Sequence, residues 1–159
     1  GVMFGKAKPI PDWYEACVAY IEAFASTLPD GVERSFERKG DYFLLDVLPP
    51  TFGHRRLTLE GSLAEFDYAL GKVWTERLEP SPTVCDRLLA SLEAVRNGAV
   101  REVRDRRTGV IYHVYRLKTH GFSEFMQDGQ YSFWHWFKLK IRDVQIHTLP
   151  PLDRPKAHA

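Results

Sequence analysis

The stretch that decides the fold runs from Tyr131 to Arg142 and consists of Tyr131-Ser132-Phe133-Trp134-His135-Trp136-Phe137-Lys138-Leu139-Lys140-Ile141-Arg142. Its side chains change character at almost every step, which predicts an extended strand because successive strand side chains leave by opposite faces. One face carries Tyr131, Phe133, His135, Phe137, Leu139 and Ile141. The other carries Trp134, Trp136, Lys138, Lys140 and Arg142. We expect the first face to lie in a core and the second to face a partner.

Further strands are predicted between residues 32 and 60 and between residues 100 and 119. Residues 32–38 and 41–48 flank Lys39-Gly40 and predict a β-hairpin, in which the glycine supplies a positive φ. The run Tyr42-Phe43-Leu44-Leu45 has little polar alternation, which favours a central strand. Residues 55–60 predict a third strand. Residues 100–106 and 110–119 predict a second hairpin, which turns at Arg107-Thr108-Gly109.

Three helices are predicted from apolar side chains that recur every three or four residues. The first covers residues 12–28, where Asp12 and Glu15 resemble a capping box. The third follows Glu79-Pro80-Ser81-Pro82 and ends at Asn97-Gly98. Between them, residues 62–78 favour a helix because Ser62 and Glu65 form a second capping-box pattern. Phe66, Tyr68 and Leu70 also alternate there, so a strand is the alternative.

These elements predict an α+β fold with a mainly antiparallel sheet of about five to seven strands, packed with about three helices in the order α-β-β-β-α-α-β-β-β, with a further strand as an option. A chain of 159 residues suits one globular domain. We expect residues 1–9 to be an N-terminal extension and residues 149–159 to be a Pro-rich tail.

Composition restricts the class of protein. A net charge of +1 gives no excess field that would attract polyanions. Cys17 and Cys85 lack a metal-binding or redox spacing, which predicts two reduced, buried thiols. The first residues form no apolar signal segment, and no stretch approaches the ~20 apolar residues of a membrane span. We therefore expect a cytoplasmic protein with no membrane partner.

No motif of an enzyme class is present, since Gly-rich phosphate loops and GxSxG elbows are missing from the sequence. The six histidines show no paired metal-ligand spacing, so no metal and no cofactor are expected. His113, Tyr115 and His135 lie on apolar strand faces. They are interpreted as core residues or, alternatively, as the lining of a ligand or catalytic pocket between sheet and helices.

The aromatic and basic face of residues 131–142 is the predicted partner-binding surface. Phe52, His54 and Arg55 are further candidates, because they follow the rigid Pro49-Pro50 in a loop and binding groups often lie on such loops. An ordinary connection between strands is the alternative for this loop. Packing beneath a helix is the alternative for Trp134 and Trp136. Stacking on the same face also allows single-stranded nucleic acid as a further alternative.

A second basic region surrounds the turn of the later hairpin and contains Arg101, Arg104, Arg106 and Arg107. It is interpreted as a solvated edge that prevents strand aggregation, with an acidic-partner docking rim as the alternative.

A compact α+β chain of this size, rich in aromatics and without a catalytic signature, is similar to bacterial immunity proteins and other small inhibitor proteins. The resemblance is one of composition, so no residue role is carried over from it. It implies a non-enzymatic protein that occludes a protein partner, such as a toxin. The partner, the oligomeric state and the sheet order are left open by the sequence.

Overall fold

The computed structural model describes residues 9–48, 56–71, 74–108, 111–117, 123–125 and 143–152. It shows an α+β protein, as the sequence predicts. Within these residues the elements are α1 (Asp12–Ser26), β1 (Glu33–Lys39), β2 (Tyr42–Leu48), β3 (Leu57–Gly61), β4 (Phe66–Leu70), β5 (Trp74–Leu78), α2 (Pro82–Asn97), β6 (Val100–Asp105), β7 (Ile111–Leu117), β8 (Ser123–Phe125) and β9 (Val144–Thr148).

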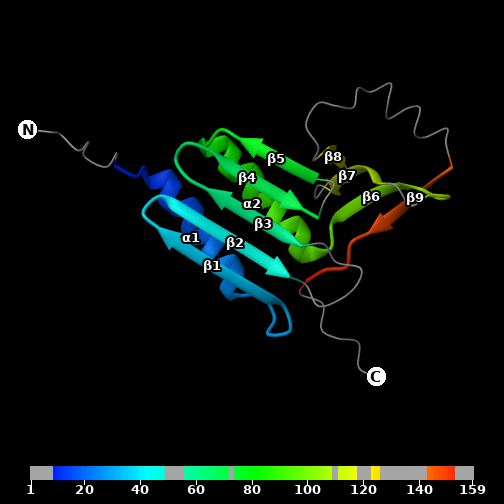
Figure 1. The fold of residues 1–159 in the computed structure, drawn as a ribbon, viewed down its shortest axis with the longest axis horizontal. Coiled ribbons are helices and arrows are strands. Elements are labelled where there is room, and N and C mark those ends of the chain that lie inside the picture. The colour runs from blue at the N-terminus through cyan, green and yellow to red at the C-terminus, as the bar shows by residue number, and fades with distance from the viewer. Residues whose placement is uncertain are drawn as a thin grey trace, which may run out of the picture.

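Two antiparallel sheets hold these strands. The first has the order β1-β2-β3-β4-β5, so every neighbour in space is also a neighbour in sequence. Figure 1 shows α1 and α2 lying behind this sheet, with its other face toward the viewer. The second sheet has the order β8-β7-β6-β9 and continues from the end of α2. The chain therefore builds a helix-covered sheet first and a smaller sheet beside it.

The first hairpin confirms the sequence prediction. Residues of β1 and β2 pair from Glu33 opposite Leu48 to Lys39 opposite Tyr42, and Gly40 takes a φ of 62° in the turn. A left-handed φ is a conformation that glycine adopts without steric cost. The predicted central position of the second strand is also confirmed, since β2 lies between β1 and β3.

The helix predicted over residues 62–78 is wrong, because the structure has strands β4 and β5 there. The alternation of Phe66, Tyr68 and Leu70 decides the outcome, and all three are buried against the helices. Gly71 breaks the helical stripe with a φ of 67° and allows the turn into β5. The described residues contain two helices where the sequence predicts three.

Both predicted capping boxes are also wrong. Ser62 and Glu65 close the turn between β3 and β4, where Ser62 N donates to the Glu65 carbonyl at 2.9 Å and Ala64 N donates to Ser62 Oγ at 3.1 Å. At the start of α1 the N-cap is Pro11, with no side-chain cap. The Ser-x-x-Glu pattern thus closes a hairpin turn here and does not begin a helix. A serine side chain can hydrogen-bond to nearby backbone groups in turns as readily as at helix N-termini.

The second helix, α2, ends as predicted. Ser81 caps its start by accepting from Val84 N at 3.1 Å, and Gly98 closes its end with a φ of 70°. Pro151 packs against this glycine so closely that a Cβ at Gly98 would lie 2.8 Å from the Pro151 ring.

The later hairpin is confirmed as well, since β6 and β7 pair antiparallel.

The core lies between the helices and the first sheet. Its fully buried side chains come from α1, α2 and strands β2–β4, and the largest include Tyr14, Phe24, Phe43, Phe66 and Tyr68. Leu149 and Leu152 belong to the same core, and Leu152 N donates to the Arg96 carbonyl at 3.0 Å. The predicted tail thus starts with packed residues. None of the described helices combines the length and the apolar character needed to cross a bilayer.

Candidate functional site

Most of the predicted site residues lie outside the described part of the chain. This holds for the partner-binding set and for the third pocket residue, which are Trp134, Trp136, Lys138, Lys140, Arg142, Phe52, His54, Arg55 and His135. The backbone of β7 places His113 opposite Val103 and Tyr115 opposite Arg101 in the second sheet. These two predicted pocket residues are thus not in the sheet that the helices cover.

The face of the first sheet that points away from the helices carries a different candidate site. We call it the outer face, and its side chains on β1–β5 are Glu33, Ser35, Glu37, Lys39, Tyr42, Leu44, Asp46, Leu48, Thr58, Glu60, Asp67, Ala69, Thr75 and Arg77. None of these side chains is fully buried. The outer face is therefore accessible to a partner.

Strand pairing arranges this face in cross-strand rows. In one row Leu44 lies opposite Glu60, Glu60 opposite Asp67 and Asp67 opposite Arg77. In the next row Thr58, Ala69 and Thr75 lie opposite one another in turn. Side chains in directly opposed positions are close enough to interact. The sheet thus brings together residues that are up to 33 positions apart in the chain.

A hollow of about 550 Å³ opens on this face and is lined by residues of β2–β5. Two adjacent cross-strand rows contribute to the lining: the short side chains of Thr58, Ala69 and Thr75 in one, and the longer ones of Glu60, Asp67 and Arg77 in the other. The hollow follows from this size difference between two adjacent rows of the sheet.

The charges along the hollow are only partly balanced. Arg77 contacts Asp67 at 3.1 Å and Glu65 at 2.8 Å, and hydrogen bonding to Asp67 raises the pKa of the arginine. Tyr42 donates to Glu60 Oε1 at 3.2 Å. Desolvation and this hydrogen bond raise the pKa of the tyrosine. Arg77 therefore serves two carboxylates, Asp67 in the lining of the hollow and Glu65 outside it.

Two acidic residues of the outer face, Glu60 and Asp67, are direct cross-strand partners. Two like charges in directly opposed positions destabilise an antiparallel sheet. Asp46 on the same face has an arginine of its own, Arg56, which contacts it through two hydrogen bonds of 2.9 and 2.8 Å. Asp67 shares Arg77 with Glu65, and Glu60 has a hydrogen bond from the neutral Tyr42, so the opposed pair at the hollow is less fully compensated than Asp46.

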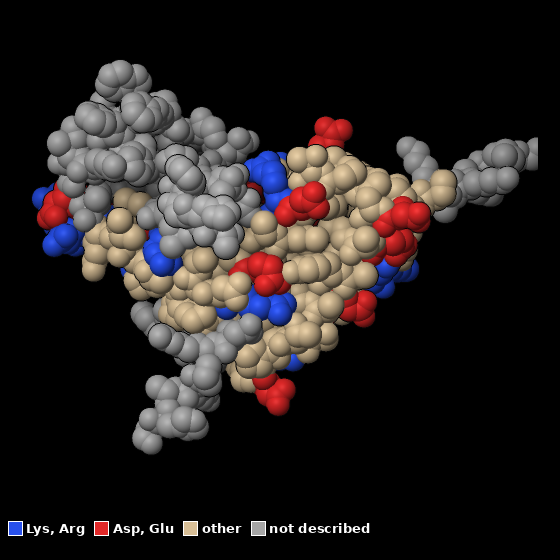
Figure 2. All heavy atoms as spheres, turned by 180° about the vertical axis from the view of Figure 1, so that it is seen from behind, with Lys and Arg blue, Asp and Glu red and all other residues tan. Residues whose placement is uncertain are grey.

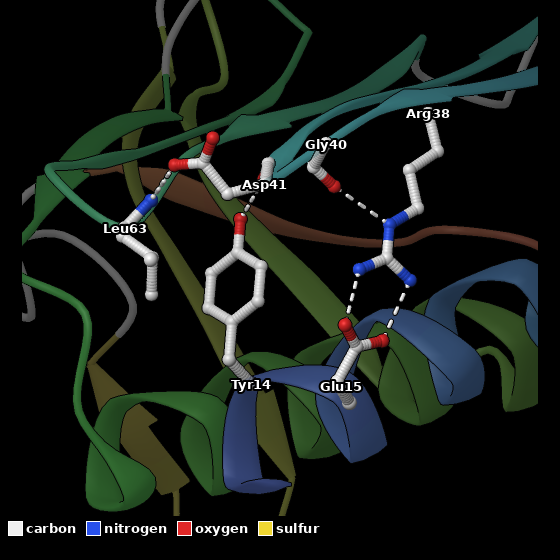
Figure 3. Close-up of polar contacts among 6 residues, drawn as sticks. All are labelled: Tyr14, Glu15, Arg38, Gly40, Asp41 and Leu63. Atoms are coloured by element: carbon white, nitrogen blue, oxygen red, sulfur yellow. Dashed lines mark hydrogen bonds and ion pairs between the residues drawn. The ribbon is translucent and has the colours of Figure 1, made fainter. Parts of the chain in front are cut away.

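The first hairpin is fixed to α1 by a set of polar contacts, which Figure 3 shows. Tyr14 donates to the Asp41 carbonyl, and the Asp41 carboxylate accepts from Leu63 N at 3.0 Å. Arg38 donates to both Glu15 oxygens, at 2.8 and 2.7 Å. The arginine lowers the pKa of Glu15, and burial raises that of Tyr14. These contacts orient the sheet on the helix and so hold the outer face in place.

The second sheet holds a buried charge. Glu102 in β6 is 2% exposed and pairs with Arg104 at 2.7 Å. Its neighbours in the basic hairpin also make local contacts, since Arg101 donates to the Gly98 and Val100 carbonyls and Arg106 contacts Asp143 at 3.0 Å. A buried carboxylate is costly unless it is paired. These arginines therefore make contacts within β6, to the end of α2 and to Asp143 beside β9. The docking rim proposed for them stays a prediction.

The two cysteines face each other across the helices. Both are free and buried, which confirms the prediction of two interior thiols. A hydrogen bond with Cys85, together with burial, raises the pKa of the Cys17 thiol. The thiolate is the form that binds metals and attacks electrophiles. In the described part of the chain, no group of three or more His, Cys, Asp or Glu side chains is placed to hold a metal ion.

Charge is divided along the chain although the total is close to zero. Residues 1–99 contain 15 acidic and 11 basic residues, whereas residues 100–159 contain 6 acidic and 11 basic ones. The outer face belongs to the acidic part. On the helical side, seen in Figure 2, charged residues form small groups separated by wide uncharged areas.

No protein-family model, curated protein or solved structure matches the chain. Sequence reasoning missed the outer face, although the alternation in residues 57–61 and 66–70 is a signal for it. That signal was obscured by the helical stripe over residues 62–78.

Proposed function

We propose that this protein is a non-enzymatic interaction protein that neutralises a partner protein by covering it, as immunity proteins do, and that the outer face of the first sheet is a contact surface. The observation that carries the proposal is the open hollow of about 550 Å³ on a sheet face with no fully buried side chain. A position in the cytoplasm belongs to the proposal, and two free thiols suit such a reducing compartment.

The shape and lining of the hollow favour a macromolecule over a small ligand. Small-molecule sites enclose most of the ligand. Here the hollow is open to solvent, and the Arg77 side chain at its rim is 76% exposed. A rim of this kind resembles the polar periphery of a protein interface, where specificity is set by charge and hydrogen bonding.

The packed core beneath the outer face also makes this face suitable for binding a partner protein. The opposite side of the same strands packs into the core through Phe43, Leu45, Leu59 and Phe66, all fully buried. Binding surfaces on rigid strands keep their geometry on association better than loops do. We therefore expect the outer face to meet its partner with little change in backbone.

The aromatic and basic residues 131–142 remain a predicted second contact region. Trp and Arg are the residue types that most often dominate binding energy at protein interfaces. Alanine at Trp134 and at Trp136 is expected to weaken partner binding while circular dichroism stays unchanged. Unaltered binding by both variants would remove this region from the proposal.

A photocrosslinking experiment tests the proposed function. A photoreactive amino acid at Thr75, which is exposed on the outer face, is compared with the same amino acid at Ala19, which is exposed on α1. In extracts of the source organism we expect one discrete protein adduct from position 75 and none from position 19. The captured protein is then purified and its own activity measured with increasing amounts of the chain.

Loss of the partner's activity at equimolar chain would support neutralisation. Equal adducts from both positions, or a captured protein whose activity is unaffected by the chain, would contradict the proposal. Turnover of a substrate by the purified chain itself would replace it with an enzymatic function.

A further inference from the structure

The opposed carboxylates on the outer face indicate what the partner presents there. Glu60 and Asp67 are direct cross-strand partners beside the hollow, and Asp67 shares Arg77 with Glu65. Bringing a cation between two such carboxylates relieves their repulsion. We propose that the partner places Lys or Arg side chains of a basic segment in the hollow, against Glu60 and Asp67. This inference rests on the proposed function and names the chemistry of its partner.

The geometry around the hollow suits a long basic side chain. Tyr42 lies at one side of Glu60, where its ring can flank a cation, and Thr58 and Thr75 supply hydroxyl acceptors in the lining of the hollow. Arg77 is largely exposed, so it can swing away from Asp67 and leave that carboxylate to the incoming group. A guanidinium that meets two carboxylates makes charge-assisted hydrogen bonds, which are stronger than neutral ones.

The charges of the outer face itself support the same partner. Its acidic side chains are Glu33, Glu37, Asp46, Glu60 and Asp67, whereas its basic ones are only Lys39 and Arg77. Complementary potential speeds the encounter of two proteins and suppresses partners of the wrong sign. A basic segment is attracted to this face, whereas a nucleic acid or an acidic segment is repelled by it.

The test uses the full chain and a short oligo-arginine peptide as the probe. Amide shifts of the labelled protein are followed by NMR during titration, with an oligo-glutamate peptide of the same length as the reference. We expect shifts concentrated at Thr58, Glu60, Asp67 and Thr75 with the basic peptide and none with the acidic one. The apparent affinity should fall as salt is raised, because exposed charges are screened.

The decisive variant is the double substitution Glu60→Gln with Asp67→Asn. We expect it to weaken oligo-arginine binding about five- to tenfold, the effect of removing two exposed ion pairs. The matched control is Glu22→Gln with Asp86→Asn, which removes the same charge from exposed positions on α1 and α2. This control should bind the peptide with unchanged affinity. Thermal unfolding of both variants checks that each is folded.

Equal weakening by the two double variants would show that only net charge matters and would overturn the inference. Shifts spread over the helices, or the same shifts produced by Ca²⁺ alone, would also overturn it. The proposed function fails separately, when position 75 captures no partner. A captured partner that binds the Glu60 and Asp67 double variant normally would leave the proposed function standing and reject the basic segment.

Discussion

The two faces of the first sheet are made by the same five strands and differ in almost every property. The inner face carries Phe43, Leu45, Leu57 and Leu59, which are completely buried beneath the helices. The outer face carries charged and hydroxyl side chains in opposed rows, with a repulsive pair at Glu60 and Asp67. Because successive side chains of a strand point to opposite faces, the same strand contributes to the buried inner face and to the exposed outer face. The pleat thus separates the side chains that stabilise the core from those of the proposed contact surface, and we expect substitutions on one face to leave the other largely unchanged.

The largest expected effect is on the inner face. Phe43→Ala removes a fully buried ring that packs against Tyr14, Phe36 and Phe66. We expect a loss of about 3–5 kcal/mol in the free energy of unfolding, measured by urea denaturation. Leu44→Ala, one residue along on the outer face, should cost less than about 1 kcal/mol. Similar costs for the two variants would break the contrast between the faces.

The second-largest loss of stability is expected at Gly61, where the neighbouring rings leave no space for a side chain on the inner face. A Cβ at Gly61 would lie 2.5 Å from ring atoms of both Phe43 and Phe66. Gly61→Ala should therefore lower the free energy of unfolding by about 1–3 kcal/mol, through overpacking. Gly31→Ala is the control, because its Cβ would meet nothing within 4 Å. Combining Gly61→Ala with Phe66→Leu should cost less than the sum of the two single changes.

A third prediction concerns pH and the contact between the helices. Tyr20 of α1 donates to Glu93 of α2, and burial together with this hydrogen bond raises the pKa of Tyr20 to about 12. A raised tyrosine pKa contributes stability below its usual value of 10 and loses it as the folded group ionises. Unfolding free energy should thus fall between pH 10 and about 12. Tyr20→Phe should flatten this fall, and an unchanged slope would exclude Tyr20 as its source.

The smallest expected effect on stability is on the outer face. The double variant Glu60→Gln with Asp67→Asn should change the free energy of unfolding by no more than about 0.5 kcal/mol, as for other surface substitutions. Relief of the opposed charges favours a slight gain. The measurement is urea denaturation in parallel with peptide titration. A large loss of stability would mean that these carboxylates support the fold and would blur the separation of the two faces.

The sequence predicted the α+β class, the first hairpin, α1, α2 and the later hairpin, because each has a local signal. Gly40 and Gly98, for example, take the positive φ values that their positions suggest. Residues 62–78 carried two conflicting periods, and tertiary packing of Phe66, Tyr68 and Leu70 selected the strand. The outer face was not predicted, because the opposition of Glu60 and Asp67 depends on register. Register is a pairing between strands that no single segment contains.

The contact between Gly98 and Pro151 has a consequence for the order of events during synthesis. Leu149 and Leu152 fill part of the core beneath the helices, and the backbone of Leu152 bonds the last turn of α2. While residues 1–99 emerge from the ribosome, that part of the interior is still unfilled. The core beneath the helices is therefore complete only once residue 152 has left the exit tunnel, and we expect the nascent protein to gain stability at that point.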